Sequence, residues 1–453
     1  MIFVRIFEKN ISMIIEFNFQ NYRSFMNLNT LSLSAVKSFK EHEDTHTVLL
    51  DDKTRLIKSA VIYGNNASGK SNLIQAITFM KSVVLNSFRD ALLDNEEKKF
   101  PLQKFLLNTE TENQPSYFEM IFIQDGVKYR YGFEINSNEV VSEWLFHTTS
   151  KEVYLFKREF SSIEINKTAF KEGLNLESKT KENVLFITLV AQLNGIISNQ
   201  VVSWFKKINC IKSASDDAYK HYTVRTLKED SQFLNWVTSF TKFLEISNVT
   251  TSERSMSEFN FDKMKIKDKE IISLLKNVQE IASKQPKLNK IITWHRKYDK
   301  DQFLVDTIPF DFDNQESEGT KKLLYLLGPW YDSLRLGKIL LVDELDSQLH
   351  SHLIIHLINF FHICNKKNAQ LICTVHDTTM LNKEIFRRDQ IYFVEKNQFG
   401  VSELYSLADF KSEHVRNKSA FEKNYLEGKY GAIPYFKYEK DIIDLLYEDE
   451  EKI

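Results

Sequence analysis

Residues Gly64-Asn65-Asn66-Ala67-Ser68-Gly69-Lys70-Ser71 match the phosphate-binding pattern G-x-x-x-x-G-K-[ST] in full. The apolar run at 59–63 precedes this stretch and predicts a buried strand, and 72–77 predicts a helix. The pattern requires this strand–loop–helix context, because the loop must present its backbone at the end of a strand. We therefore predict an α/β fold organised around a loop that cradles phosphate groups.

Each residue type in this loop has a chemical reason. Glycines let backbone N–H groups turn toward phosphate oxygens, and the start of the following helix adds a positive field. Lys70 is expected to reach the β- and γ-phosphates, and the Ser71 hydroxyl is expected to hold Mg²⁺. We predict that the residues binding the nucleoside triphosphate are Gly64, Asn65, Asn66, Ala67, Ser68, Gly69, Lys70, Ser71 and Asn72.

The composition limits the kind of protein. The 453 residues are enough for about two or three domains, and 42% hydrophobic residues are ample for a packed core. A net charge of −2 gives no global basic field toward nucleic acid, although a dimer can still assemble a local basic groove. The cysteines Cys210, Cys364 and Cys373 have no C-x-x-C spacing, which argues against disulfides or zinc and favours a reducing cytoplasm.

The sequence predicts neither a membrane span nor a signal peptide. The longest apolar runs, such as 339–342, are far shorter than a span, and residues 1–13 carry charges and lack a small-residue cleavage site. We expect a soluble cytoplasmic protein without membrane contact. Met13 is an alternative translation start, because the first clear strand begins just after it.

Hydrophobic patterns predict how the rest of the chain is organised. Strands are expected at 14–19 and 31–34, then in a hairpin at 118–133 that turns at Asp125-Gly126 and continues as a meander through 143–146 and 153–156. Residues 183–284 are expected to be mostly helical, with helices at 189–205 and 233–244, and strands return at 291–294 and 303–305.

These patterns predict three parts. They are an N-terminal lobe at 1–165 with the phosphate loop and the meander, a mostly helical insertion at 166–288, and a C-terminal lobe at 289–453. No heptad repeat is sustained, so the middle third is not expected to form the long coiled-coil arm of chromosome-structuring ATPases.

A second apolar strand, at 338–342, ends in the adjacent acids Asp343 and Glu344. Ligands of parallel sheets bind at the carboxyl ends of the strands. Asp343 is expected to complete the Mg²⁺ shell, directly or through water, and Glu344 is expected to act as the general base on the attacking water. The alternative is an ordinary solvated turn at a strand end, and the phosphate loop upstream favours the catalytic interpretation.

A third apolar strand, at 371–375, is followed by His376. The predicted helix at 352–364 connects it to the preceding strand, which makes a βαβ unit. This arrangement predicts His376 at the same sheet edge as Lys70 and Glu344, where a neutral imidazole would bond the γ-phosphate or the lytic water. A histidine after a strand is otherwise a packing or surface residue. A metal-binding His-Asp pair is disfavoured because no companion His-x-Asp accompanies His376-Asp377.

Five segments taken in order resemble the ABC-type ATPases of the SMC and RecF kind: Asn21-Tyr22-Arg23-Ser24-Phe25, the phosphate loop, Ser317-Glu318-Gly319-Thr320, Asp343-Glu344 and His376. More narrowly, the segments 387–396, 403–410 and 425–434 resemble the bacterial RloA/AbiLi-type AAA family ATPases of abortive-infection loci, which are related to OLD-family heads. The resemblance covers both ends of the chain and little of the middle.

This resemblance implies an ABC-type P-loop ATPase head, in which a mixed or parallel sheet accompanies an antiparallel meander. It further implies that the head hydrolyses ATP with Mg²⁺ as a head-to-head homodimer. Ser317 and Gly319 of one subunit would close over the γ-phosphate held by the loop of the other subunit, and Arg23 would lie near the nucleotide. Taken alone, Ser317 is only a helix N-cap residue.

The chain departs from the family pattern at two positions. Glu318 replaces the first glycine of the usual L-S-G-G-Q signature, and Leu349-His350 replaces the usual aspartate beyond the acidic strand. Gln103 is a candidate for the glutamine-loop ligand and is equally well an ordinary surface residue.

Two functions stay open. The resemblance implies a regulatory ATPase whose ATP-driven closure controls a separately encoded effector, of RloB/AbiLii type or another nuclease, in anti-phage defence. The alternative is a RecF-like clamp on duplex DNA, which needs a basic stripe; the available charges are Lys206, Lys207, Lys212, His221 and Arg225. A nuclease of the OLD kind is not expected, because too few residues follow His376 for a TOPRIM domain.

Overall fold

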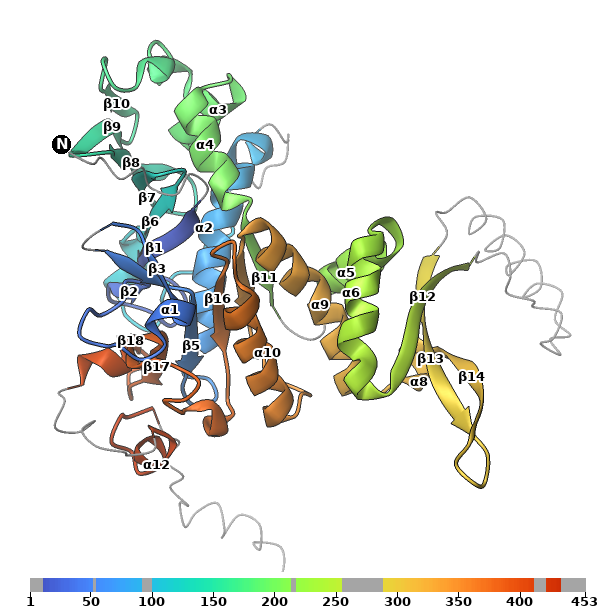
Figure 1. The fold of residues 1–453 in the computed structure, drawn as a ribbon. Coiled ribbons are helices and arrows are strands. Elements are labelled where there is room, and N and C mark those ends of the chain that lie inside the picture. Colours follow the sequence, from blue (N-terminus) through green and yellow to red (C-terminus); the bar gives the residue numbers. More distant parts are fainter. Residues whose placement is uncertain are drawn as a thin grey trace, which may run out of the picture. The chain divides into compact units, whose positions relative to one another are not determined.

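The structure is a computed structural model and describes residues 11–51, 54–91, 100–212, 217–254, 288–410 and 421–432. The chain divides into two compact units. The first comprises Met1–Ile208 with Gln370–Ile453, and the second comprises Asn209–Ala369. Figure 1 labels their helices and strands. The division into three parts at residues 165 and 288 stays a prediction.

An antiparallel sheet of seven strands, in the order β10-β9-β8-β7-β6-β1-β2, forms one layer of the first unit. Its strands are β1 (Ser12–Gln20), β2 (Asn29–Ser32), β6 (Ser116–Gln124), β7 (Val127–Ile135), β8 (Val140–Thr148), β9 (Glu152–Glu159) and β10 (Ser162–Ile165). Asp125 and Gly126, between β6 and β7, both have positive φ angles, as a two-residue hairpin turn requires. The predicted hairpin and meander are confirmed.

A second group of strands in the same unit has the order β16-β5-β17-β18. β16 (Gln370–Thr374) and β17 (Ile391–Lys396) run parallel to β5 (Ser59–Tyr63), and β18 (Ser402–Ser406) runs antiparallel to β17. Every residue of β5 and β16 is buried, which explains why both strands are continuous apolar runs in the sequence. This mixed sheet beside an antiparallel meander confirms the predicted fold class.

Three longer helices belong to the first unit: α2 (Lys70–Asp90), α3 (Phe186–Gln192) and α4 (Ile196–Phe205). Both α3 and α4 contact α2. The sequence predicts a single helix at 189–205, whereas the structure has two with a bend of 112° between them. The chain turns at Asn194, whose φ angle of 66° is left-handed, and at Gly195, so the apolar spacing continues across a break in the backbone.

A buried carboxylate fixes the start of α3 to the meander. Glu143 on β8 is fully buried and accepts hydrogen bonds from the backbone N–H of Phe186 and Ile187, at 2.6 and 3.1 Å. It also accepts a bond of 3.0 Å from the Tyr131 hydroxyl, and the Arg158 guanidinium lies 3.8 Å away. Burial raises the pKa of Glu143, and Arg158 together with these donors opposes that rise.

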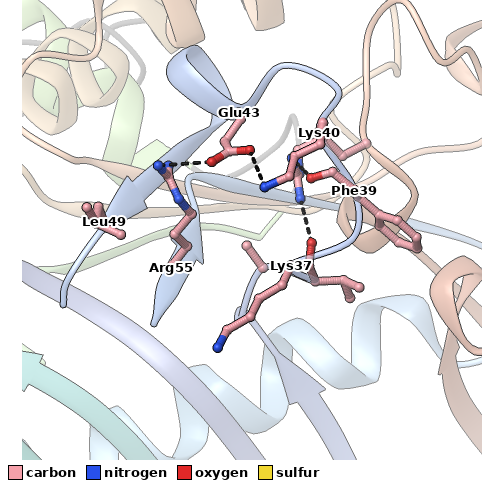
Figure 2. A pocket seen from close by; sticks show the side chains of 9 residues that line it. Lys37, Phe39, Lys40, Glu43, Leu49 and Arg55 are labelled. Carbon is pink, nitrogen blue, oxygen red and sulfur yellow. Dashed lines mark hydrogen bonds and ion pairs between the residues drawn. The ribbon is translucent and has the colours of Figure 1, made fainter. Parts of the chain in front are cut away.

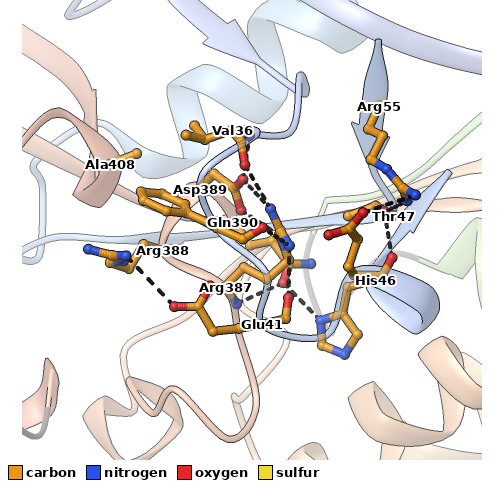
Figure 3. Close-up of polar contacts among 12 residues, drawn as sticks. Val36, Glu41, His46, Thr47, Arg55, Arg387, Arg388, Asp389, Gln390 and Ala408 are labelled. Atoms are coloured by element: carbon orange, nitrogen blue, oxygen red, sulfur yellow. Dashed lines mark hydrogen bonds and ion pairs between the residues drawn. The ribbon is translucent and has the colours of Figure 1, made fainter. Parts of the chain in front are cut away.

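The other α-helices and strands in the described part of the first unit are short. They are α1 (Glu43–His46), the paired strands β3 (Thr47–Leu49) and β4 (Arg55–Ile57), and α12 (Phe421–Leu426). Arg387, which is 1% exposed, joins this region to the C-terminal part of the chain (Figure 3). Its guanidinium donates to the backbone oxygens of Phe39 and Glu41, at 3.0 and 2.7 Å, and pairs with Asp389 at 2.8 Å.

The second unit contains α5 (Asp217–Glu229), α6 (Ser231–Phe240), α8 (Phe312–Gln315), α9 (Glu318–Leu336) and α10 (Ser351–Cys364). Its strands are β11 (Ile208–Ile211), β12 (Ile246–Arg254), β13 (Leu288–Tyr298), β14 (Leu304–Asp311) and β15 (Ile339–Val342). Strands β12, β13 and β14 form an antiparallel sheet, β11 neighbours β15, and α9 contacts α5 and α6.

Most sequence predictions for the second unit are confirmed, and one needs correction. Helices α6 and α10 and strands β13, β14 and β15 lie where the patterns predict them. β11 and β12, by contrast, fall within the stretch expected to be mostly helical. β12 pairs with a strand far along the chain, with Val249 opposite Thr293, and such non-local pairing overrides a helical pattern. The part of that stretch at 255–284 lies outside the described residues.

Candidate nucleotide-binding site

The phosphate loop lies between the end of β5 and the start of α2. Gly69 is the N-cap residue of α2, which begins at Lys70. The amides of Asn72 and Leu73 donate to the Gly69 carbonyl oxygen at 2.9 and 3.2 Å, so the first turn of the helix is closed. The positive end of α2 therefore adjoins the loop, as an anion site requires.

Neighbouring strands force two positions of the loop to be glycine. Gly64 has a φ angle of +154°, and a Cβ atom there would lie 2.3 Å from the Val394 carbonyl oxygen of β17. Gly69 has a φ angle of +116°, and a Cβ atom there would lie 2.6 Å from the Ser402 Oγ and 2.7 Å from the Ser24 Oγ. The loop backbone is therefore packed against the sheet in a way that no other residue allows.

Lys70 is held over the first residues of the loop. Its side chain is buried, and its Nζ donates to the carbonyl oxygens of Gly64 at 2.7 Å and Asn65 at 3.0 Å. Ser71 lies half-buried in the first turn of α2, whereas Asn66 and Ala67 are exposed at the tip of the loop. The phosphate role of Lys70 and the metal role of Ser71 stay predictions.

Arg23 and Ser24 lie beside the start of α2. The Asn72 side chain accepts a bond of 3.4 Å from Arg23 and donates a bond of 2.7 Å to the Ser24 hydroxyl. The backbone N–H of Arg23 donates to the Gln103 carbonyl oxygen at 2.8 Å, and that of Ser402 donates to the Ser24 carbonyl oxygen at 2.7 Å. The structure thus brings the predicted residues Arg23 and Asn72 together.

Several buried polar atoms around the loop have no hydrogen-bond partner among the described residues. They are the Oδ1 of Asn65, the Oγ of Ser68, the Nε of Arg23 and the Oε1 of Gln75. Buried polar groups in proteins are nearly always bonded, so a group of unbonded ones marks a place for a polar ligand. Together with the glycine positions and the buried ammonium, these atoms fit a bound nucleoside triphosphate.

An open groove of about 700 Å³ runs beside this cluster. Its walls are Arg23, Ser24, Asn72, Leu102, Gln103, Lys104, Phe105, Leu106, Leu107, Ser137, Lys396 and Gly400. Leu106 and Leu107 are each 71% exposed, so one wall is apolar, whereas Lys104, Lys396 and Arg23 carry positive charge. The volume lies in the range of small-ligand sites. Gln103 lines the groove, and its role as a magnesium ligand stays a prediction.

A smaller cavity of about 190 Å³ lies elsewhere in the first unit, beside β3 and β4 (Figure 2). Lys37, Lys40 and Arg55 contribute to its lining, and Glu43 lies among them. The Glu43 carboxylate pairs with Arg55 at 3.0 Å and with Lys40 at 3.1 Å. This carboxylate occupies two of the cations, Lys40 and Arg55, and the cavity is smaller than the groove beside the phosphate loop.

His376 follows β16, which is the parallel neighbour of β5. Thr374 pairs with Ile62, and the amide of Val375 donates to the Ile62 carbonyl oxygen at 3.1 Å. The imidazole of His376 is exposed. His376 and the phosphate loop therefore both follow the carboxyl ends of adjacent parallel strands, which agrees with the predicted placement of this histidine relative to Lys70.

In the second unit, Asp343 and Glu344 follow β15 directly. Asp343 is 6% exposed, and its amide donates to the Ile211 carbonyl oxygen at 2.9 Å. Glu344 is half-buried and has a left-handed φ angle of 51°. Non-glycine residues adopt this conformation at a cost, and such residues gather at functional sites. The predicted metal and general-base roles stay predictions.

Ser317 and Gly319 lie at the start of α9. The Ser317 hydroxyl accepts a bond of 3.1 Å from the Thr320 amide and is therefore an N-cap group. The sequence places the helical pattern from residue 323, whereas α9 begins at Glu318, directly after this cap. Ser317 is exposed, so the N-terminus of α9 is accessible.

The sequence does not single out Ser402 or Lys322, although both hold functional segments in place. The Ser402 hydroxyl donates a bond of 2.5 Å to the Ser68 carbonyl oxygen, from a position far along the chain. The Lys322 ammonium binds the loop that follows Asp343 and Glu344. Ser24 belongs to the segment Asn21-Tyr22-Arg23-Ser24-Phe25, and its contact with Asn72 follows from the fold.

A family described as "AAA domain, putative AbiEii toxin, Type IV TA system" matches residues 59–382. This range contains the phosphate loop, Ser317, the Asp343-Glu344 pair and His376. The chain belongs to this AAA-domain family. A search of curated proteins gives no significant match.

Solved structures similar to this AAA domain include heads of SMC proteins. The SMC head domain from Thermotoga maritima has a TM-score of 0.38 and 13% identity, covering 87% of this chain and 98% of that one. An SmcHead bound to the C-winged helix domain of ScpA has a TM-score of 0.35 and 12% identity, and the match covers 87% of this chain and 97% of that one. A third similar structure is an Smc head domain with an extended coiled coil, bound to the C-terminal domain of ScpA derived from Pyrococcus furiosus. It has a TM-score of 0.37 and 12% identity, and the match covers 92% of this chain and 100% of that one.

Among the described residues, no single helix is both long and apolar enough to cross a membrane. The bent pair of α3 and α4 passes the same test by length and composition alone.

Proposed function

We propose that this AAA domain binds ATP with Mg²⁺ and hydrolyses it to ADP and phosphate. One observation carries the proposal: the complete phosphate loop is folded between a buried parallel strand and a helix N-terminus, with Lys70 over the loop. The unbonded Asn65 and Ser68 atoms support it, because they lie in the loop itself. The matching family is an AAA-domain family, which supports the same activity.

Each candidate residue has a role in this reaction. Lys70 binds the β- and γ-phosphates, and Glu344 accepts a proton from the attacking water. Ser71 and Asp343 would hold Mg²⁺ through their side-chain oxygens, and the bound ion would neutralise charge on the phosphate oxygens. His376 donates a hydrogen bond to the γ-phosphate or orients the water. Arg23 binds the nucleotide from beside Asn72.

We also propose that hydrolysis needs a head-to-head homodimer. The exposed, capped start of α9 supports this arrangement, because Ser317 and Gly319 are accessible to the nucleotide of a second subunit. Under this proposal, ATP closes the dimer and hydrolysis opens it. The Glu344→Gln variant with ATP should elute as a dimer in size-exclusion chromatography with light scattering, whereas adding Ser317→Arg should leave it monomeric. A Glu344→Gln protein that stays monomeric with ATP would contradict the proposal.

The cellular role that we propose is anti-phage defence in the cytoplasm, as an RloA/AbiLi-like regulator of a separately encoded effector. This role rests on the resemblance of segments 387–396, 403–410 and 425–434 to that family; the description of the matching family names a putative toxin of a toxin–antitoxin system and no regulator. We propose an effector of RloB/AbiLii type or another nuclease, docked on the aromatic strands of the meander or on the helical segments.

No observation in the structure favours the DNA clamp. Among the basic residues available to it, Lys207 donates to the Ser12 hydroxyl at 2.6 Å, and Arg225 lies 4.0 Å from the Glu229 carboxylate. A clamp needs several phosphate-binding cations along one surface. We therefore treat DNA binding as an outcome of the experiment below.

The experiment is a pull-down of Glu344→Gln from cells that carry its native neighbouring genes, with Lys70→Ala as the matched control that binds no nucleotide. Mass spectrometry and nucleic-acid staining identify what is bound. A stoichiometric protein partner on Glu344→Gln and not on Lys70→Ala supports effector control. Nuclease-protected DNA without a protein partner would contradict it and favour the clamp.

A further inference from the structure

One buried lysine ties the start of α9 to the loop that follows β15. Lys322 is 6% exposed, and its Nζ donates to the carbonyl oxygens of Glu344 at 2.8 Å, Leu345 at 3.1 Å and Ser347 at 2.7 Å. It also donates to the Ser347 hydroxyl at 2.6 Å. A buried ammonium that is surrounded by oxygen acceptors is a strong and directional link.

The loop that Lys322 binds contains two residues in an unfavourable backbone conformation. Glu344 and Gln348 have left-handed φ angles of 51° and 61°, although neither is glycine. Each such residue costs on the order of 1 kcal/mol or more and persists only where surrounding contacts hold it. The amide of Ser347 closes the turn by donating to the Glu344 carbonyl oxygen at 3.1 Å, which is the oxygen that Lys322 also binds.

A second contact joins the same two segments. A Cβ atom at Gly319, in the first turn of α9, would lie 2.8 Å from the Gln348 carbonyl oxygen. The backbone at Gly319 therefore approaches the far end of the loop, while Lys322 binds its beginning and middle. Two separate contacts therefore link the start of α9 to the loop that carries Glu344.

We propose that Lys322 is a positioning residue that sets the orientation of Glu344 and couples it to the Ser317–Gly319 turn of the same subunit. This inference rests on the proposed ATPase function. It adds a mechanism of regulation. When the nucleotide held by a second subunit engages Ser317 and Gly319 of the first subunit, this contact orients Glu344, the general base of that first subunit. Glu344 then attains its catalytic position only when the dimer is closed.

Burial lowers the pKa of Lys322 to about 8, and the Asp346 and Glu344 carboxylates oppose that decrease. Methionine has a similar length and no N–H donor, so Lys322→Met removes the bonds and keeps most of the volume. Lys321 provides the matched control, because its Nζ pairs instead with the Glu318 carboxylate at 2.9 Å.

The test compares Lys322→Met with Lys321→Met. For Lys322→Met we expect kcat to fall by about 10- to 100-fold, because a general base misplaced by about 1 Å loses that much. The Kd for ATP should stay within about twofold, because the phosphate loop is unchanged, and Lys321→Met should keep the parental kcat. A Lys322→Met kcat equal to that of Lys321→Met, or a loss of ATP affinity that accounts for the whole decrease, would overturn the proposal.

Two further measurements distinguish a failure of the Lys322 proposal from a failure of the proposed ATPase function. Hydrogen exchange on Lys322→Met should be faster at the Ser347 and Leu349 amides, which close the loop, and unchanged in α2. Unchanged exchange at both amides overturns the proposal, whether or not the parental protein turns over ATP. A parental protein that does not turn over ATP contradicts the proposed ATPase function instead. If Lys322→Met does not fold, Lys322→Leu removes the same hydrogen bonds with a shorter apolar side chain, and a parental kcat in that variant overturns the proposal.

Discussion

At the residue scale, the phosphate loop contains one strained position beside its two glycines. Ala67 has a left-handed φ angle of 62°, which costs an L-residue roughly 1–2 kcal/mol. Glycine adopts this angle without strain, at an entropic cost of roughly 0.5–1 kcal/mol. Ala67 is also exposed, so a methyl group there contributes little packing. The alanine at this position therefore reduces the stability of the loop.

We expect Ala67→Gly to raise the free energy of unfolding by up to about 1 kcal/mol and to leave ATP binding intact. Urea denaturation provides the measurement. Ala60→Gly on the buried strand β5 is the control; it should destabilise the protein, because the same change there removes a buried methyl group without relieving strain. A lower stability of Ala67→Gly than of the parental protein would refute the strain argument.

Some functional residues can be recognised from a continuous stretch of sequence, and others only from contacts between distant segments. Gly64 to Ser71 form one continuous motif, so their shared placement in the structure could be predicted. Arg23 was named from a resemblance, and the structure supports its place through the bond to Asn72. Lys322 and Ser402 could not be found from sequence, because their roles consist of contacts with backbone oxygens of distant segments.

At the scale of elements, the contact between α1 and the C-terminal segment is sensitive to acid. His46 is 4% exposed, and its Nδ1 lies 2.9 Å from the Gln390 Oε1 (Figure 3). The pKa of His46 is lowered to about 4, mainly by burial and in smaller part by the charges of His42, Arg387 and Lys58, while the hydrogen bond to Gln390 opposes the decrease. The folded state therefore keeps this imidazole neutral where the unfolded chain, with a pKa near 6.5, binds a proton.

Stability from this group is present above about pH 6.5 and is lost as the pH falls toward about 4, because the unfolded state then binds more protons. Between pH 7 and pH 5 the expected loss is about 2 kcal/mol. His46→Asn keeps an N–H donor and does not titrate, so it should lose about 2 kcal/mol less over that interval. Urea midpoints at the two pH values provide the measurement, and equal losses in both proteins would contradict the assignment.

The Glu143 network gives a second prediction at this scale. Glu143→Ala leaves the buried Arg158 guanidinium without its counter-charge and the Phe186 amide without its acceptor, so it should lower the free energy of unfolding by about 3 kcal/mol or more. Glu152→Ala is the control, because that half-exposed carboxylate pairs with Arg130 at the surface and should matter little. A similar small effect for both variants in thermal denaturation would show that the network contributes no stability.

Strands and helices were predictable where their patterns are local. β5, β15 and β16 are short apolar runs, and their burial in the structure explains those runs. The failures have a common cause. β12 becomes a strand through pairing with β13, and the break between α3 and α4 depends on the turn at Asn194, so neither follows from apolar spacing.

At the scale of the whole molecule, the chain carries its candidate residues in two sets. The first unit contains the phosphate loop, Arg23 and His376, and the second contains Asp343 and Glu344 together with Ser317 and Gly319. The first unit is assembled from both ends of the chain, and residue spacing alone does not predict which elements join it.

The measurement that tests the central claim most directly is the steady-state release of phosphate from ATP with Mg²⁺, made together with ATP binding, for the parental protein, Lys70→Ala and Glu344→Gln. We predict turnover by the parental protein only. Lys70→Ala should lose ATP binding, and Glu344→Gln should bind ATP with near-parental affinity and turn it over at least about 100-fold more slowly. A Glu344→Gln protein that hydrolyses ATP at the parental rate, or a parental protein that binds no ATP, would contradict the account.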